Sequence, residues 1–131
     1  MTIRVLQTSK CATPVGPYSQ GVIANGFVFV AGEKGLDPAT NKLVAGGIVP
    51  ETRQCLTNIQ NVLAEAGCTM DDVVSSTVHM VNLADFAAMN QVYGEFFKKN
   101  PPVRTAVGVS ALPVGASVEI TCIAVLPNKK D

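Results

Sequence analysis

The hydrophobic pattern predicts a first pair of strands around residue 25. Two runs rich in β-branched and aromatic residues, Val22–Ala24 and Phe27–Val30, flank the dipeptide Asn25-Gly26. Asn-Gly is the strongest short signal for a two-residue hairpin turn, because both residues tolerate positive φ. We therefore expect an antiparallel hairpin, followed at residues 35–47 by a loop of turn-forming residues, GLDPATNKLVAGG.

Residues 50–67, PETRQCLTNIQNVLAEAG, have the apolar spacing of an amphipathic helix. The stripe at i, i+3, i+4 and i+7 consists of Cys55, Leu56, Ile59, Val62, Leu63 and Ala66. Such a stripe is typical of a helix with one face in the core, and Gly67 suits the position just after its end. The polar residues Arg53, Asn58, Asn61 and Glu65 are expected to fall away from the stripe.

Residues 85–100, DFAAMNQVYGEFFKKN, predict a second helix. Its core stripe consists of Phe86, Met89, Tyr93, Phe96 and Phe97. Asp85 is placed to cap the start, and the pair Lys98-Lys99 suits the negative end of the helix dipole.

Further strands are predicted at residues 72–83, DVVSSTVHMVNL, and in two runs between residues 103 and 127. The elements then follow the order β-β-α-β-α-β-β, within a single domain that spans residues 1–131. This order fits an α+β fold in which one mixed sheet carries both helices on one face. The other face of the sheet would be bare, and association with further copies of the chain is one way to cover it.

Composition and charge narrow the possible functions. The chain of 131 residues is 47% hydrophobic and has ten basic and ten acidic residues, so its net charge is zero. Scattered charges without a basic patch argue against binding to nucleic acid or to an anionic membrane surface. No apolar run is long enough to cross a bilayer, and the N-terminus lacks the pattern of a signal or transit peptide. We expect a cytoplasmic protein.

The cysteines and the histidine do not predict a metal site. Cys11, Cys55, Cys68 and Cys122 form no C-x-x-C pair, and the sole histidine, His79, has no cysteine close to it in sequence. Zinc sites usually combine such ligands at short, regular spacings. The thiols are therefore expected to be reduced core residues, and His79 to be structural.

Two charged residues stand out in the apolar C-terminal segment. Between residues 103 and 127 only Arg104 and Glu119 are charged. Because strand residues alternate between faces, Arg104 shares a side with Ala106, and Glu119 shares a side with Thr121. Two interpretations are open. The charges form a structural ion pair, or their polar faces line a common cleft in which the arginine fork binds a carboxylate.

The motifs of the chain resemble those of one family over nearly its whole length. Residues 101–125, PPVRTAVGVSALPVGASVEITCIAV, are similar to the C-terminal signature of the RidA family, also called the YjgF family. GPYSQG at residues 16–21 resembles the family's N-terminal element, and AGEKGLDP at residues 31–38 its Ser-Gly-Gln loop. The resemblance implies a chorismate-mutase-like fold and a homotrimer with clefts between subunits. It also implies a deaminase without a cofactor that hydrolyses enamine and imine intermediates to 2-keto acids and ammonia.

The resemblance also implies roles for individual residues. Arg104 would bind the substrate carboxylate, with the backbone N–H of Gly32 as a second donor. Glu119 would position or activate the attacking water as a general base, and the carbonyl of Ala106 would help to place that water. Imines are electrophilic, so positioning and electrostatics suffice without a metal or an activated nucleophile.

Tyr18 would line the same pocket, and Asn90 would contribute from the second helix, in the cleft between subunits. The chain departs from the family in the loop Ala31-Gly32-Glu33-Lys34, where relatives commonly have Ser-Gly-Gln and an apolar residue. If Glu33 and Lys34 point into the cleft, they change its charge and its substrate range. The other possibility, typical of loop residues, is that they pair with each other or with solvent.

Two rival functions remain open on the sequence. One is a trimeric protein that binds a keto acid or a similar anion in the same cleft without turnover. The other is inhibition of translation or cleavage of RNA, activities that have been attributed to relatives. The neutral net charge and the lack of a basic aromatic surface count against the RNA-directed activity.

Overall fold

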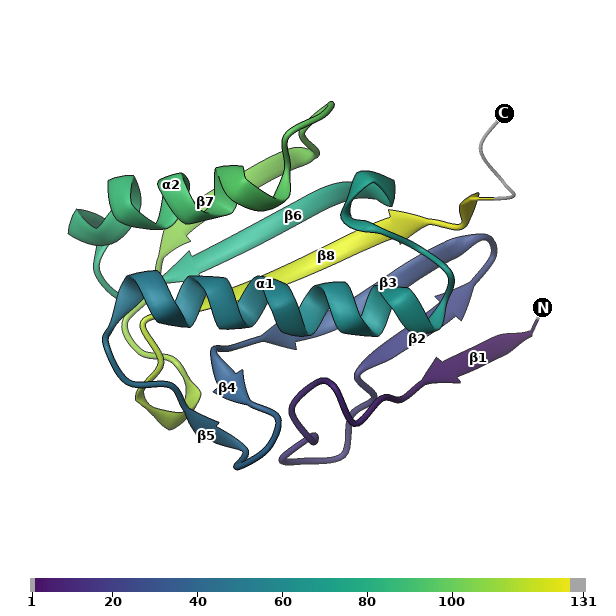
Figure 1. Ribbon diagram of the computed structural model, residues 1–131, viewed down its shortest axis with the longest axis horizontal. Coiled ribbons are helices and arrows are strands. Elements are labelled where there is room, and N and C mark those ends of the chain that lie inside the picture. The colour runs from purple at the N-terminus through teal and green to yellow at the C-terminus, as the bar shows by residue number, and fades with distance from the viewer. Residues whose placement is uncertain (1, 128–131) are drawn as a thin grey trace.

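A six-stranded mixed sheet forms the centre of the computed structural model, which describes residues 2–127 (Figure 1). Its strands follow the spatial order β1-β2-β3-β8-β6-β7. In chain order they are β1 (Ile3–Leu6), β2 (Gly21–Ala24), β3 (Phe27–Glu33), β6 (Val73–Met80), β7 (Val103–Gly108) and β8 (Val118–Val125). Only β6 and β7 pair in parallel; the other neighbours are antiparallel. The α+β fold with a mixed sheet is thus confirmed.

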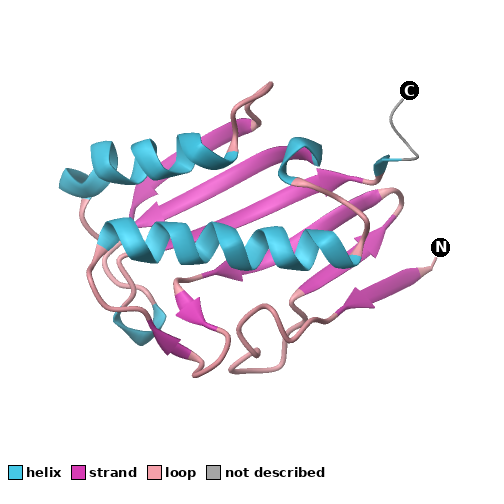
Figure 2. Ribbon diagram, in the orientation of Figure 1, coloured by secondary structure: helices cyan, strands magenta, loops and turns pink. Residues whose placement is uncertain are grey.

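Both helices cover the same face of this sheet, as the sequence predicts. Helix α1 (Ile48–Glu65) crosses in front of β3 and β8, and α2 (Phe86–Phe96) lies beside it, over the end of the sheet formed by β6 and β7 (Figures 1 and 2). Three short 3₁₀ turns, at Met70–Asp72, Leu83–Asp85 and Pro113–Gly115, connect the longer elements. Within residues 2–127, neither helix combines the length and the apolar character needed to span a membrane.

The local turn signals are confirmed, but the predicted order omits three short strands. Asn25 and Gly26 have φ angles of 53° and 83°, as a tight hairpin turn requires. The strand β1 pairs with β2, and the loop at residues 35–47 contains β4 (Leu36–Asp37) and β5 (Lys42–Leu43), which pair only with each other. These strands have two to four residues each, too short for a readable period-two pattern.

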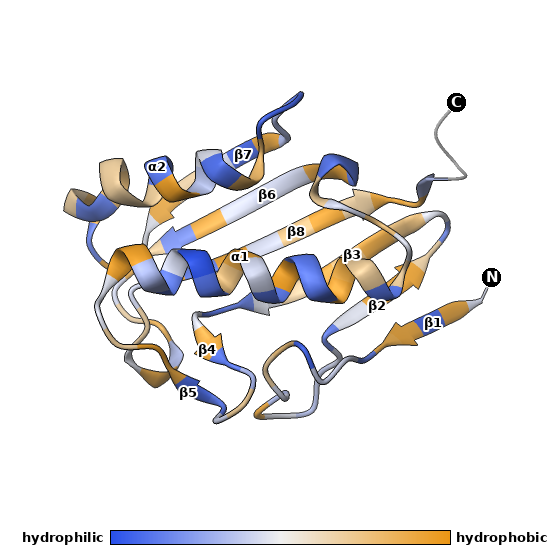
Figure 3. Cartoon of the chain, viewed as in Figure 1, coloured by the Kyte–Doolittle hydropathy of each residue, from blue (hydrophilic) through white to orange (hydrophobic). Residues whose placement is uncertain are grey.

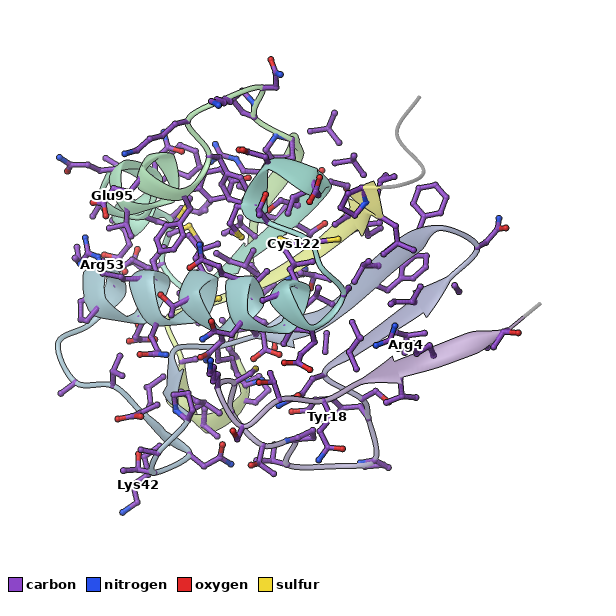
Figure 4. The ribbon with its side chains drawn as sticks, turned by 45° about the vertical axis from the view of Figure 1, so that its right-hand side comes forward. Arg4, Tyr18, Lys42, Arg53, Glu95 and Cys122 are labelled. Carbon is purple, nitrogen blue, oxygen red and sulfur yellow. The ribbon has the colours of Figure 1, made fainter. Side chains whose placement is uncertain are left out.

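The core lies between the sheet and the helices. Alternate residues of β8 are fully buried against the stripe of α1. Figure 3 shows hydrophobic positions, in orange, along both elements. The buried β8 residues are Val118, Ile120, Cys122 and Ala124; Cys122 is labelled in Figure 4. All four cysteines are buried, as expected for small core residues. Each fully buried leucine or isoleucine of α1 contributes about 2 kcal/mol of transfer free energy.

Two side chains of the predicted helices do not lie where the stripes place them. Asn58 is fully buried, and its amide donates to the backbone carbonyls of Leu36 (2.9 Å) and Lys34 (3.4 Å). The buried amide is stable at this position because it hydrogen-bonds to backbone carbonyl groups of a loop that lies outside the main sheet. Phe86, predicted to be in the core, is 37% exposed and lies against Arg104.

The face of the sheet away from the helices is uncovered in the single chain. The strand register places Phe27, Phe29 and Val107 on this outer face, each at least 40% exposed. On the same outer face, Thr121 of β8, Thr77 of β6 and Thr105 of β7 lie side by side on neighbouring strands. An exposed apolar face of this kind is typical of a surface that contacts another chain.

Candidate functional site

Glu119 lies on the outer face near the start of β8. Its neighbours Val118 and Ile120 point into the core, so strand alternation directs the Glu119 side chain to the other side. Lys34, which directly follows β3, places its Nζ 3.4 Å from Glu119 Oε2. The two side chains are 7% and 22% exposed, so this ion pair is largely withdrawn from solvent.

Gly32 makes room for the carboxyl group of Glu119. A Cβ at position 32 would lie 3.0 Å from Glu119 Cδ and 3.2 Å from Thr121 Oγ1, closer than most real contacts of a Cβ. The register of β3 against β8 also shifts between Val30 and Glu33, so the ladder is irregular at this point. An irregular strand with a glycine lets the carboxyl group lie across the backbone of β3.

A hollow of about 440 Å³ opens beside this pair. We call it the Glu119 hollow; it is lined by Val15, Tyr18, Ala31, Gly32, Lys34, Pro113, Glu119 and Thr121. Tyr18 is 43% exposed, and its hydroxyl accepts a hydrogen bond from the N–H of Val15 at 3.3 Å. Tyr18, Gly32 and Glu119, three of the residues predicted for the site, therefore meet in one hollow.

Arg104 lies on the edge strand β7 and points toward α2. Its Nη1 donates to Asn90 Oδ1 at 2.6 Å, and its guanidinium carbon lies 4.8 Å from the ring centre of Tyr93 and 5.5 Å from that of Phe86. Cation–π contacts and the bond to Asn90 hold the guanidinium in one orientation. A guanidinium has five N–H donors, so one bond to Asn90 leaves others available to a ligand.

A second hollow, of about 450 Å³, opens beside the guanidinium. We call it the Arg104 hollow; it is lined by Asn90, Tyr93, Gly94, Phe97, Pro101, Pro102 and Arg104. Ala106 follows two residues later on β7, with its side chain packed against the core. Because β7 is at the edge of the sheet, one side of its backbone has no neighbouring strand.

The expected common cleft of Arg104 and Glu119 is not present within one chain. Across the sheet Arg104 pairs with Ser76, whereas Glu119 pairs with His79. Two strand spacings and a three-residue offset separate their Cα atoms by roughly 14 Å, and their side chains leave opposite faces. The alternative of a direct ion pair is also wrong, since Glu119 pairs with Lys34 and Arg104 with Asn90.

Glu33 is buried: it does not face solvent, and it lines neither hollow, although a substrate-binding role would require that it line one. It is 6% exposed, and its Oε1 accepts a hydrogen bond from Cys11 Sγ at 3.3 Å. Desolvation raises the pKa of the Glu33 carboxyl to about 7, while the bond from Cys11 and the charge of Lys34 act in the opposite direction. A carboxyl with this pKa changes its protonation near neutral pH, directly behind the pair of Lys34 and Glu119.

This pKa predicts the pH dependence of stability in Glu33→Gln. The folded protein keeps a proton on Glu33 that the unfolded chain loses above an ordinary pKa of 4.5, so wild-type stability falls between about pH 4.5 and pH 7. Glutamine does not titrate. The free energy of unfolding of the variant, relative to that of wild type, should therefore rise by about 2 kcal/mol from pH 5 to pH 8. Urea unfolding of variant and wild type at both pH values measures this difference in the free energy of unfolding. A difference that is the same at pH 5 and pH 8 would contradict the titration of Glu33. Glu95→Gln on the surface is the control.

Sequence reasoning missed several contacts of the two hollows. Nothing in the stripe of α2 indicates that Tyr93 and Phe86 support Arg104, because both look like ordinary core aromatics. His79 lies opposite Glu119 on β6, and its Nδ1 is buried without a hydrogen-bond partner among the described residues. The strand register that brings His79 and Glu119 together is a property of the folded sheet. Among residues 2–127, no group of three or more His, Cys, Asp or Glu side chains is placed to hold a metal ion.

Similarity to known sequences is consistent over the whole fold. The family described as endoribonuclease L-PSP matches residues 8–126. The chain is 44% identical over 122 residues to the 2-iminobutanoate/2-iminopropanoate deaminase of the goat Capra hircus, covering 93% of this chain and 89% of the relative. It is 45% identical over 130 residues to a RutC family protein of the cyanobacterium Synechocystis, covering 98% of this chain and all of the relative.

Solved structures agree with the sequence relatives. The crystal structure of RidA from the Antarctic bacterium Psychrobacter superposes with a TM-score of 0.90 at 37% identity, covering 93% of this chain and 98% of the other. At this level of identity and coverage, the relationship extends to the sequence as well as to the fold. The chain therefore belongs to the RidA family, also called the YjgF family, to which the endoribonuclease L-PSP description applies.

Proposed function

We propose that this protein hydrolyses 2-imino acids, and enamines such as 2-aminoacrylate that convert to them, to 2-keto acids and ammonia. The observation that carries the proposal is the presence of two complementary half-sites. One offers a pre-oriented guanidinium on Arg104, and the other offers a carboxylate on Glu119 beside an open hollow. The name of the goat relative, an imine deaminase at 44% identity, supports the same chemistry.

The two half-sites are proposed to meet between copies of the chain in a homotrimer. Within one chain Arg104 and Glu119 lie on opposite faces, so neither completes the site of the other. The exposed apolar outer face, which includes Phe29 and Val107, would be buried by contact with a second copy of the chain. The edge strand β7 is open to contact with such a copy. Docking the β7 edge of one copy onto the Glu119 hollow of the next would place both groups around one substrate.

Arg104 would bind the substrate carboxylate. Its guanidinium is held by Asn90, Tyr93 and Phe86, so little side-chain entropy is lost when an anion arrives. The planar fork matches the two oxygens of a carboxylate, a match that the single ammonium of a lysine does not offer. This contact fixes the imine carbon relative to the rest of the site.

Glu119 would act as the general base toward water. The carboxylate accepts a proton as the water oxygen bonds to the imine carbon, and the imine nitrogen takes up a proton. The resulting carbinolamine then breaks its C–N bond, so that a 2-keto acid and ammonia leave. The backbone N–H of Gly32, the carbonyl of Ala106 and the hydroxyl of Tyr18 are proposed to hold the water and the substrate in place.

A coupled assay tests this function. An amino-acid oxidase generates a 2-imino acid in the presence of semicarbazide, which traps the imine, and the trapped product is followed by absorbance. The protein is expected to reduce trapping in proportion to its concentration, because it removes the imine before the trap does. Trapping that is unaffected by the protein would contradict the deaminase function.

The rival functions predict different results. A keto-acid-binding protein without turnover would bind pyruvate and leave imine trapping unchanged. An RNA-directed activity would require binding to RNA at low salt, which the net charge of zero does not favour. The four buried cysteines agree with the reducing cytoplasm as the proposed compartment.

A further inference from the structure

Lys34 lines the Glu119 hollow. The side chain is 7% exposed, and Nζ lies 3.4 Å from Glu119 Oε2. Burying an ammonium group costs free energy unless the group is paired. The buried ammonium of Lys34 therefore needs a carboxylate partner at this hollow. Among the described residues, Glu119 is the carboxylate with which it forms an ion pair.

The backbone around Lys34 is anchored on the same helix that supports β8. The Lys34 carbonyl accepts hydrogen bonds from the N–H of Leu36 (2.8 Å) and from the buried amide of Asn58 on α1 (3.4 Å). Glu51, also on α1, accepts from the N–H and the hydroxyl of Ser117, just before β8 begins. Lys34 and Glu119 are therefore held at a fixed separation by α1.

The charges of the proposed shared site balance only when Lys34 is counted. Arg104 of one copy and Lys34 of the next supply two positive charges, and Glu119 and the substrate carboxylate supply two negative charges. Behind them, buried Glu33 has a raised pKa of about 7, mainly from desolvation, and accepts from the thiol of Cys11. Without Lys34, one positive charge fewer would offset the negative charges of Glu119 and of the substrate carboxylate.

We propose that Lys34 is a positioning residue of the site. It holds the Glu119 carboxyl group turned into the hollow, and it offsets the negative charge that the substrate brings. This inference rests on the proposed deaminase function and adds to it a residue that acts through Glu119. A purely structural role is disfavoured because replacing a buried ion pair by apolar groups is often neutral or stabilising.

The test is the KM and kcat of Lys34→Met for an imino acid, since methionine keeps most of the length of the side chain and removes its charge. At pH 8 the KM for an imino acid should rise about fivefold with kcat within about twofold, because the missing charge acts on the binding of an anion. Lys42→Met is the matched control; Lys42 is exposed on β5 and projects away from the sheet (Figure 4), and its loss should change neither quantity.

The outcomes separate this inference from the function on which it rests. If wild type turns over imines and Lys34→Met has an unchanged KM, Lys34 is only structural and the inference is wrong. If wild type shows no turnover, the deaminase function fails, and pyruvate binding by calorimetry then decides the role of Lys34. A roughly fivefold weaker affinity in the variant supports the charge balance, and an equal affinity refutes it. If Lys34→Met does not fold, as judged by circular dichroism, Lys34→Gln replaces it in the same measurements.

Discussion

Arg104→Ala is expected to lower kcat/KM for 2-imino acids by about 100-fold and to weaken pyruvate binding to a similar degree. The guanidinium is already oriented by Asn90 and Tyr93, so its removal deletes a preformed, charge-assisted, bidentate contact. Arg104→Lys should recover part of the loss, because it restores the charge without the planar fork. The coupled imine assay and calorimetry with pyruvate measure the two effects.

Arg53→Ala is the matched control for the loss of an arginine. Arg53 on α1 pairs with Glu95 on α2 at 3.0 Å, and both side chains are about half exposed (Figure 4). Such a surface pair contributes at most about 1 kcal/mol to stability, so this variant should keep full activity. If Arg104→Ala clears imines as fast as Arg53→Ala does, Arg104 does not bind the substrate.

Glu119→Gln is expected to lower kcat by about 100- to 1000-fold, because an amide cannot accept the proton of the attacking water. Pyruvate binding should be retained or strengthened, since Lys34 would lose the carboxylate that neutralises it. Single-turnover measurements and calorimetry separate these two effects. A variant that has lost pyruvate binding together with turnover would instead assign Glu119 to ligand binding.

Glu95→Gln serves as the control for the loss of a carboxylate. Glu95 is exposed on α2, its partner is Arg53, and it lines neither hollow. A keto-acid-binding protein without catalysis would show no turnover in wild type, in Glu95→Gln or in Glu119→Gln. Turnover that is present in the first two and absent in the third identifies an enzyme.

The sequence predicts the layout of the fold because its strongest signals are local. The hairpin at Asn25-Gly26 and the end of α1 at Gly67 depend on the φ angles that a few residues accept, and both are confirmed. Strand β1 (Ile3–Leu6) is missed because four residues carry too little periodicity and its stability comes from pairing with β2. Asn58 is misplaced because its partners, the carbonyls of a distant loop, are not visible in a helical stripe.

The grouping of residues on the strand faces is predictable from the sequence, but the geometry of the candidate site is not. Alternation along β7 and β8 correctly groups Arg104 with Ala106 and Glu119 with Thr121, but it does not say which group faces the helices. That choice depends on the register of both strands against β6, a long-range property. The sequence leaves the direction of Lys34 open for the same reason, since its partner Glu119 lies 85 positions away in sequence.

Mixing two inactive variants is the most direct test of a site shared between copies. Arg104→Ala and Glu119→Gln are unfolded together at equal concentrations, refolded, and assayed for imine clearance. In a cyclic trimer each interface takes Arg104 from one copy and Glu119 from the next, so random assembly restores about a quarter of the wild-type activity. Activity that stays at the level of the separate variants, in a sample shown by native mass spectrometry to contain mixed trimers, would contradict a shared site.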